Sequence, residues 1–135
     1  MAFRHYRLVA WQRADDLYLE IHSITRKVFP ADEKYELSAQ ARRAAYSVAA
    51  NIVEGFGRTP GRDRLRFLRI AWGSLAEVDY CLHVARRLDY VDEATYTACD
   101  ERVQQVGAPL MGLIRAELRR IRSGAFPSSS SPSSS

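Results

Sequence analysis

The sequence predicts an all-α protein whose four helices form an up-and-down antiparallel bundle. In four segments, apolar residues recur every three or four positions, which is the period of one helix face. Short stretches containing proline, glycine or aspartate separate these segments, and no segment alternates with period two for long enough to form a strand. Four amphipathic helices joined by short connections are expected to pack antiparallel around one core.

The sequence predicts the first two helices between residue 8 and the glycines at positions 55 and 57. The apolar stripe of the first helix covers residues 8–28, and Pro30 ends it because the residue before a proline avoids the helical conformation. Ser38 is expected to cap the second helix, whose stripe is mostly alanine and lets a neighbouring helix approach closely. Gly55 and Gly57 are expected to supply the backbone freedom that ends it.

The third and fourth helices follow two further breaks in the pattern. After the stretch RTPGRD, we expect Thr59 to cap the third helix and Pro60 to occupy its first turn. The apolar stripe of this helix extends over residues 65–88. Asp92 is the expected N-cap of the fourth helix, and Pro109 should bend that helix because proline removes one backbone hydrogen bond.

The chain divides into one folded domain and a tail. From Ser123 onward, the stretch SGAFPSSSSPSSS has no charged residue and almost no apolar one, so it cannot offset the entropy lost on ordering. We therefore predict a four-helix bundle over residues 1–122 and a disordered tail over residues 123–135.

The positive charge of the chain is carried mainly by arginine. The formal net charge is +4, and eighteen of the twenty basic residues are arginines. A guanidinium binds phosphate through a rigid fork of donors, so the composition permits nucleic-acid binding, although a solvated basic surface would have the same composition. Cys81 and Cys99 stand alone. We expect neither a signal peptide nor a membrane span, because the first residues carry charges throughout and no apolar run reaches membrane-spanning length. We expect a soluble cytoplasmic protein.

The sequence lacks the usual patterns of metal sites and catalytic sites. Its histidines are scattered, and the nearest ligand-like pair, Asp79 with His83, is better interpreted as a surface hydrogen bond. Ser47 and Ser74 lack the context of a nucleophilic serine, and GFGRTPGR lacks the spacing of a phosphate-binding loop. We therefore predict no enzymatic activity, no cofactor and no bound metal.

Two lines of polar residues run along the second and third predicted helices. We interpret them first as groups that satisfy one another and fix the register of the helices. The alternative is a core pocket in which Asn51, Glu54 and Glu77 bind a small ligand or act catalytically. The first line consists of Arg43, Ser47, Asn51 and Glu54, and the second of Arg69, Gly73, Glu77 and Tyr80.

Arginines concentrate at the start of the third helix and at the end of the fourth. In an antiparallel bundle these two segments lie at the same end, so we expect one basic surface with salt-sensitive, sequence-indifferent affinity for nucleic acid. Phe56 and Phe67 are the nearby aromatic residues that could stack on bases. The candidate nucleic-acid-binding residues are Arg58, Arg62, Arg64, Arg66, Arg69, Arg115 and Arg119, with Arg120 and Arg122 close by.

Three stretches carry a family resemblance: LVAWQRADDL, FPADEKYELSAQARRAAYSVAANIVEGFGR and FLRIAWGSLAEVDYCLHVARRLDYV. Over residues 3–122, the chain resembles the small four-helix bundle proteins encoded in intervening sequences of bacterial 23S ribosomal RNA genes. The resemblance implies a ring-like homopentamer around a central channel and no enzymatic activity. Related bundles are accessory proteins of diversity-generating retroelements that bind nucleic acid and a reverse transcriptase. The resemblance implies that Asn51, Glu54, Gly55 and Gly57 are the family's signature. The structural polar signature that we expect comprises these four residues with Arg43 and Glu77.

Two functions follow from these observations as hypotheses. The first is a non-enzymatic oligomeric bundle that binds structured RNA or DNA through its arginine-rich end. The alternative is an adaptor that docks a protein partner, such as a reverse transcriptase, without contacting nucleic acid. Neither hypothesis requires a membrane.

Overall fold

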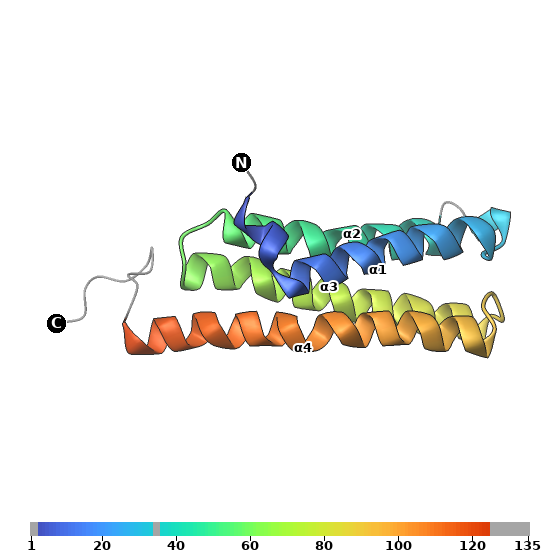
Figure 1. Cartoon of the computed structure of the whole chain (residues 1–135). Helices are drawn as coiled ribbons and strands as arrows, with labels where there is room; N and C mark the ends of the chain where they lie inside the picture. The colour runs from blue at the N-terminus through green and yellow to red at the C-terminus, as the bar shows by residue number, and fades with distance from the viewer. Residues whose placement is uncertain (1–2, 34–35, 125–135) are drawn as a thin grey trace.

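The computed structural model describes residues 3–33 and 36–124, and within these residues every regular element is helical (Figure 1). The predicted all-α class and the four long helices are therefore confirmed. The fourth helix includes Ser123, which the sequence had placed in the tail, while residues 125–135 of that tail lie outside the described residues. The elements are η1 (Arg4–Arg7), α1 (Val9–Lys27), η2 (Ala31–Glu33), α2 (Leu37–Phe56), α3 (Arg62–Arg87) and α4 (Glu93–Ser123).

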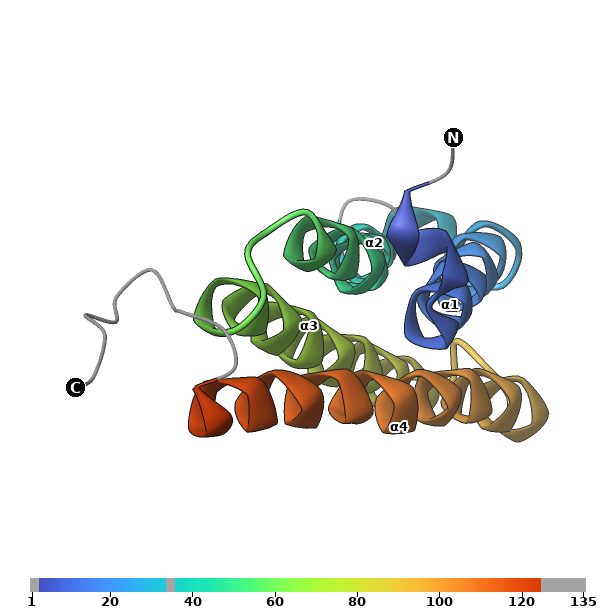
Figure 2. The same cartoon turned by 60° about the vertical axis from the view of Figure 1, so that its left-hand side comes forward.

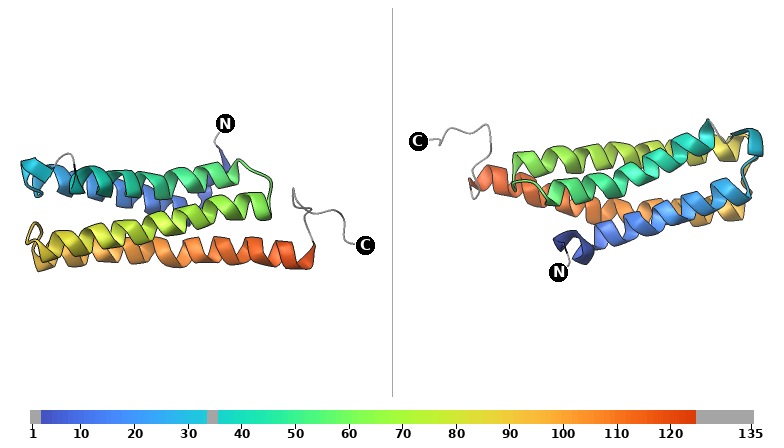
Figure 3. Two further views of the ribbon diagram at one scale, coloured as in Figure 1. Left: turned by 180° about the vertical axis from the view of Figure 1, so that it is seen from behind. Right: turned by 90° about the horizontal axis from the view of Figure 1, so that it is seen from above.

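The four long helices form an up-and-down bundle in which each helix packs against two others. The helix α2 lies between α1 and α3, and α4 closes the bundle against α3 and α1. Figures 2 and 3 show that the first turns of α3 and the last turns of α4 extend beyond the start of α1. At this end the short helix η1 packs against α2. The end is therefore built from α2, α3, α4 and η1.

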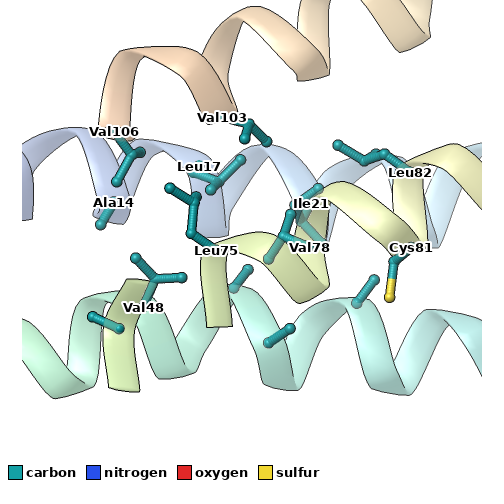
Figure 4. Close-up of a cluster of buried hydrophobic side chains, with 14 of the residues drawn as sticks. Ala14, Leu17, Ile21, Val48, Leu75, Val78, Cys81, Leu82, Val103 and Val106 are labelled. Carbon is teal, nitrogen blue, oxygen red and sulfur yellow. The ribbon is translucent and has the colours of Figure 1, made fainter. Parts of the chain in front are cut away.

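The core is formed by the apolar stripes that the sequence predicts. Burying one leucine or valine side chain of this kind contributes about 1.5–3 kcal/mol relative to an exposed position. A few residues of the predicted stripes are not buried. They include Trp72, whose side chain is 39% exposed, and Leu88, which lies beyond the end of α3. Figure 4 shows side chains of the four helices converging, among them Ala14, Leu17, Ile21, Val48, Leu75, Val78, Val103 and Val106.

The helix starts agree with the sequence at Asp92 and differ at Ser38, Thr59 and Pro60. Pro60 precedes the N-cap of α3 and so lies outside the first turn that it was expected to occupy. Asp92 caps α4 as predicted, because its Oδ1 accepts a hydrogen bond from the Thr95 backbone N–H at 2.8 Å. Ser38 does not cap α2, since it lies inside the first turn and is buried. Thr59 does not cap α3 either. That position belongs to Gly61, whose φ of 99° is one that glycine adopts without strain.

The two glycines near the end of α2 do not have the predicted role of a helix stop. Gly57 follows the last residue of α2 with a right-handed φ of −88°, which any residue can adopt. Gly55 lies inside the helix, and a Cβ atom there would stand 3.3 Å from the carbonyl oxygen of Arg64 and 3.4 Å from Cβ of Phe67. Its function is therefore to let α3 approach the backbone of α2 closely.

Candidate nucleic-acid interface

The two predicted arginine groups meet at one end of the bundle. The start of α3 and the end of α4 lie side by side there (Figures 1 and 2). The backbone N–H of Gly61 donates a hydrogen bond to Oε1 of Glu117 at 2.8 Å, which ties the α2–α3 connection to α4. We call this region, with the end of α2 and the helix η1, the arginine-rich end.

Arg64 is a correction to the predicted binding surface. Its side chain is 4% exposed, and its Nε donates to the carbonyl oxygen of Gly55 at 3.1 Å while Nη2 donates to that of Arg58 at 3.3 Å. Burial lowers the pKa of Arg64, and the carboxylate of Glu117 opposes this shift. Because its guanidinium is enclosed by the protein, Arg64 holds α2 and α3 together and does not face a ligand.

Glu117 is the buried counter-ion of this arginine, and the sequence analysis did not identify it. Its side chain is 2% exposed, and Oε2 lies 3.8 Å from Nη1 of Arg64 and 3.3 Å from Nε of Arg120. The sequence did contain a signal. Glu117 stands three residues after Ile114, at the next position of the apolar stripe of α4. A carboxylate at a core position indicates a buried partner of opposite charge.

Four arginines of this end, three of them exposed and Arg64 buried, are arranged around two phenylalanines. The guanidinium carbon atoms of Arg58 and Arg66 lie 4.9 and 4.5 Å from the ring centroid of Phe67, within the range of cation–π interactions. Phe56 is covered in the same way by Arg64 at 4.2 Å and by Arg4 at 5.4 Å. The two rings therefore orient arginines, and guanidinium groups lie over the rings that were predicted to stack on bases.

Arg4 is a further basic residue of this end that the sequence analysis did not include. It belongs to η1, and its side chain is exposed beside Phe56. No sequence pattern links it to Arg58 or Arg66, because the contact depends on how η1 packs against α2.

A groove of about 480 Å³ separates the start of α3 from the end of α4. Three arginines of α3, Arg62, Arg66 and Arg69, line it. Its remaining lining is apolar and comes from both helices, namely Leu65, Leu118 and Ile121. Arg115 and Arg119 are exposed on the adjoining turns of α4. This combination of cationic and apolar groups can bind phosphate while it excludes water from part of the contact.

The polar line of α2 is a structural connection, and its contacts differ from those expected. The side-chain amide of Asn51 donates to the carbonyl oxygen of Ser47 at 2.8 Å and to its Oγ at 2.9 Å. Oγ of Ser47 in turn lies 2.7 Å from Oγ of Ser74, which links α2 to α3. Glu54 was expected to be satisfied by other members of the polar lines, but it forms an exposed ion pair with Arg58, four residues later, at 2.9 Å.

The other members of the two polar lines are surface residues. The side chains of Arg43, Arg69, Glu77 and Tyr80 are exposed. Arg69 and Glu77 both belong to α3, where Arg69 lines the groove and Glu77 is exposed, so the expectation that the members of the lines satisfy one another is not met by these two residues. This arrangement does not form the core pocket that the alternative interpretation of Asn51, Glu54 and Glu77 required.

The structure offers no reactive thiol within the described ranges. Cys81 and Cys99 are both buried and free, and burial raises the pKa of Cys99 to about 11. In residues 3–33 and 36–124, no group of three or more histidine, cysteine or acidic side chains is placed to hold a metal ion. Within the same part of the chain, no helix combines the length and apolar character needed to cross a bilayer.

Comparison with known proteins shows where this fold occurs. A sequence model of the family described as 23S rRNA-intervening sequence protein matches residues 6–112. The chain is also similar to a solved structure from Bacteroides thetaiotaomicron, a protein of unknown function from the S23 ribosomal protein family, with a TM-score of 0.73 and 20% identity. The similarity covers 79% of this chain and 99% of that one, and it supports the fold alone. No curated protein matches the chain.

Proposed function

The chain belongs to the 23S rRNA-intervening sequence protein family, and we propose that this member is a non-enzymatic bundle that binds structured RNA or DNA. The observation that carries the proposal is the groove in which Arg62, Arg66 and Arg69 stand opposite the apolar side chains of α4. The exposed Arg58, Arg115 and Arg119 extend the basic surface to either side of this groove.

The chemistry of this surface suits a phosphate backbone better than base edges. Guanidinium groups bind phosphate oxygens through two parallel hydrogen bonds. The cation–π contacts of Arg58 and Arg66 with Phe67 restrict the motion of these side chains and so reduce the entropy lost on binding. Phosphate contacts carry no direct sequence information, so we expect a preference for shape over sequence.

We also propose that the protein acts as a homo-oligomer, and the family resemblance implies five copies. The supporting observation is a second groove of about 420 Å³ between α1 and α2, lined in part by the aromatic side chains of Trp11, Tyr18 and Tyr46. Tyr46 is largely exposed in the single chain. A pentamer would multiply the +4 charge of the chain fivefold and repeat the arginine-rich end around one ring.

The same α1–α2 groove supports the second candidate function, an adaptor that docks a protein partner such as a reverse transcriptase. Aromatic residues are enriched in the cores of protein interfaces. In that case the arginines would be a solvated surface that binds no nucleic acid, and replacing Tyr46 with alanine would abolish binding of the protein partner.

A charge-matched pair of triple variants tests the nucleic-acid proposal. The variant R62Q/R66Q/R69Q removes the three arginines of the groove, and the control K27Q/R43Q/R87Q removes three exposed cations elsewhere on the bundle. We expect the first to weaken binding to a structured RNA or a DNA duplex by at least about tenfold more than the control, with the same helicity. Equal losses in both variants would mean that only the net charge matters, and unchanged binding would refute the proposal.

A further inference from the structure

The end of the bundle opposite the arginine-rich end is where α1 ends and α2 begins (Figure 1). A cavity lies at this end. Its volume is about 460 Å³, which is in the range of small-molecule sites. The lining comes from the last turns of α1, the first turns of α2 and residues 29–31 between them. It comprises His22, Thr25, Arg26, Phe29, Pro30, Ala31, Ser38 and Arg42.

Arg42 is held in place in the wall of this cavity. Its Nε donates a hydrogen bond to Oγ1 of Thr25 at 2.7 Å, and that hydroxyl donates to the carbonyl oxygen of Ile21 at 2.7 Å. Thr25 is itself buried. A guanidinium has five N–H groups, so with Nε engaged the terminal nitrogens of Arg42 are the ones that can bind an oxyanion in the cavity.

Ser38 lines the same cavity, and its hydroxyl group lacks a hydrogen-bond partner among the described residues. Its side chain is 1% exposed, and its Oγ is shielded from solvent without a hydrogen-bond partner in the part of the chain that the structure describes. Buried hydroxyl groups nearly always have a partner. Because a serine hydroxyl can change between staggered rotamers, this group can turn towards a ligand and donate to it.

The start of α2 adds to the attraction for an anion. This helix has 20 residues, and the side chain of its N-cap Glu36 makes no cap hydrogen bond. The N–H groups of a first helical turn have no partner within the helix, and the positive end of the helix dipole lies there. Arg26 contributes a further positive charge at the rim. The exposed carboxylates of Asp32 and Glu36 lie on the adjoining chain and outside the lining.

We propose that this cavity binds the phosphate group of a small phosphorylated molecule. In this arrangement the terminal nitrogens of Arg42 bind two phosphate oxygens, and the hydroxyl of Ser38 donates to one of them. Phe29 and Pro30 form the apolar wall against which the organic part of the ligand packs. The proposal does not depend on nucleic-acid binding, because it uses none of the arginines of the arginine-rich end.

The test is calorimetric titration of the full chain with pyrophosphate and with inorganic phosphate. The variants are Arg42→Gln, Ser38→Ala and the control Arg43→Gln, which removes the same charge from the next residue of α2, where the side chain is exposed outside the cavity lining. We expect saturable binding that R42Q weakens by at least about tenfold and R43Q by less than about twofold. S38A should weaken binding about threefold or more while the melting temperature of the free protein stays equal or rises, because the unpaired hydroxyl is gone.

Three results would overturn the proposal. The first is no saturable binding of either anion at millimolar concentration. The second is an equal loss in R42Q and R43Q, which would indicate a general charge effect. The third is a loss in R62Q/R66Q/R69Q with R42Q unaffected, which would place the anion at the arginine-rich end. S38A serves as the deciding variant if R42Q does not fold, since the alanine keeps the Arg42–Thr25 bond intact.

Discussion

Replacing the buried Glu117 with glutamine should destabilise the bundle far more than the same substitution at an exposed glutamate does. The substitution keeps an oxygen that can accept from the N–H of Gly61, but it removes the only negative charge recorded in an ion pair with the buried Arg64 in the described residues. Removing one partner of a buried ion pair typically costs about 3–5 kcal/mol. Here Arg64 keeps its bonds to two backbone carbonyls and the ion pair is long, so we expect about 2–4 kcal/mol.

Urea unfolding followed by circular dichroism measures this loss. With an m-value of about 2 kcal/mol/M, the midpoint should fall by roughly 1–2 M. The matched control is Glu54→Gln, which breaks the exposed i,i+4 pair with Arg58 and should cost no more than about 0.5 kcal/mol. All samples need the same protein concentration, because an oligomer's apparent stability depends on it. A loss for E117Q as small as that for E54Q would refute the structural role assigned to this pair.

Three further predictions concern the packing, the cap and the thiols. Gly55→Ala should destabilise the folded protein by about 1–3 kcal/mol, because the added Cβ atom would press on α3. Gly73→Ala should stabilise it by about 0.5–1 kcal/mol, because the Cβ atom there meets open space. Thermal unfolding in which the two variants change the melting temperature in the same direction would contradict this. The hydrogen bond from Thr95 lowers the pKa of Asp92. The cap therefore stabilises above the unfolded-state pKa and is lost as pH falls through the folded pKa. Asp92→Ala should lower the melting temperature at neutral pH and make no difference in strong acid; a gap that persists in acid would argue against the cap. Cys81 and Cys99 should react with a thiol reagent at pH 8 only after unfolding, because burial raises the pKa of both thiols; rapid labelling of the folded protein would show that they are accessible.

The periodicity of the sequence predicted the helices because helix formation in this chain follows from apolar stripes that one core can bury. Asp92 was predictable for a similar reason, since a cap is a local interaction within four residues. Ser38 and Thr59 have the right side chains for caps, but tertiary packing places the helix starts elsewhere. Local patterns therefore located the elements better than their ends.

The buried ion pair between Arg64 and Glu117 was not predicted, although the helical period contains a signal for it. Arg64 lies four residues before Leu68, so it occupies a position of the apolar stripe of α3, as Glu117 does in α4. The density of arginines along α3 does not distinguish Arg64 from Arg62 and Arg66. The helical period does, because it places Arg64 on the buried face of the helix and the other two on exposed faces. The stacking on Phe67 and the position of Arg4 could not be predicted, because they depend on side-chain geometry and on the packing of η1.

The most direct test of the central claim is the affinity for a DNA duplex and for a structured RNA over a range of salt concentrations. If the exposed arginines contact the phosphate backbone, log affinity should fall linearly with log salt, and each lost contact should reduce the slope for B-DNA by about 0.9. We predict a steep slope for the wild type that decreases by roughly 2–3 per chain in R62Q/R66Q/R69Q. No binding at low salt, or a slope unchanged in that variant, would contradict the account and favour the adaptor function.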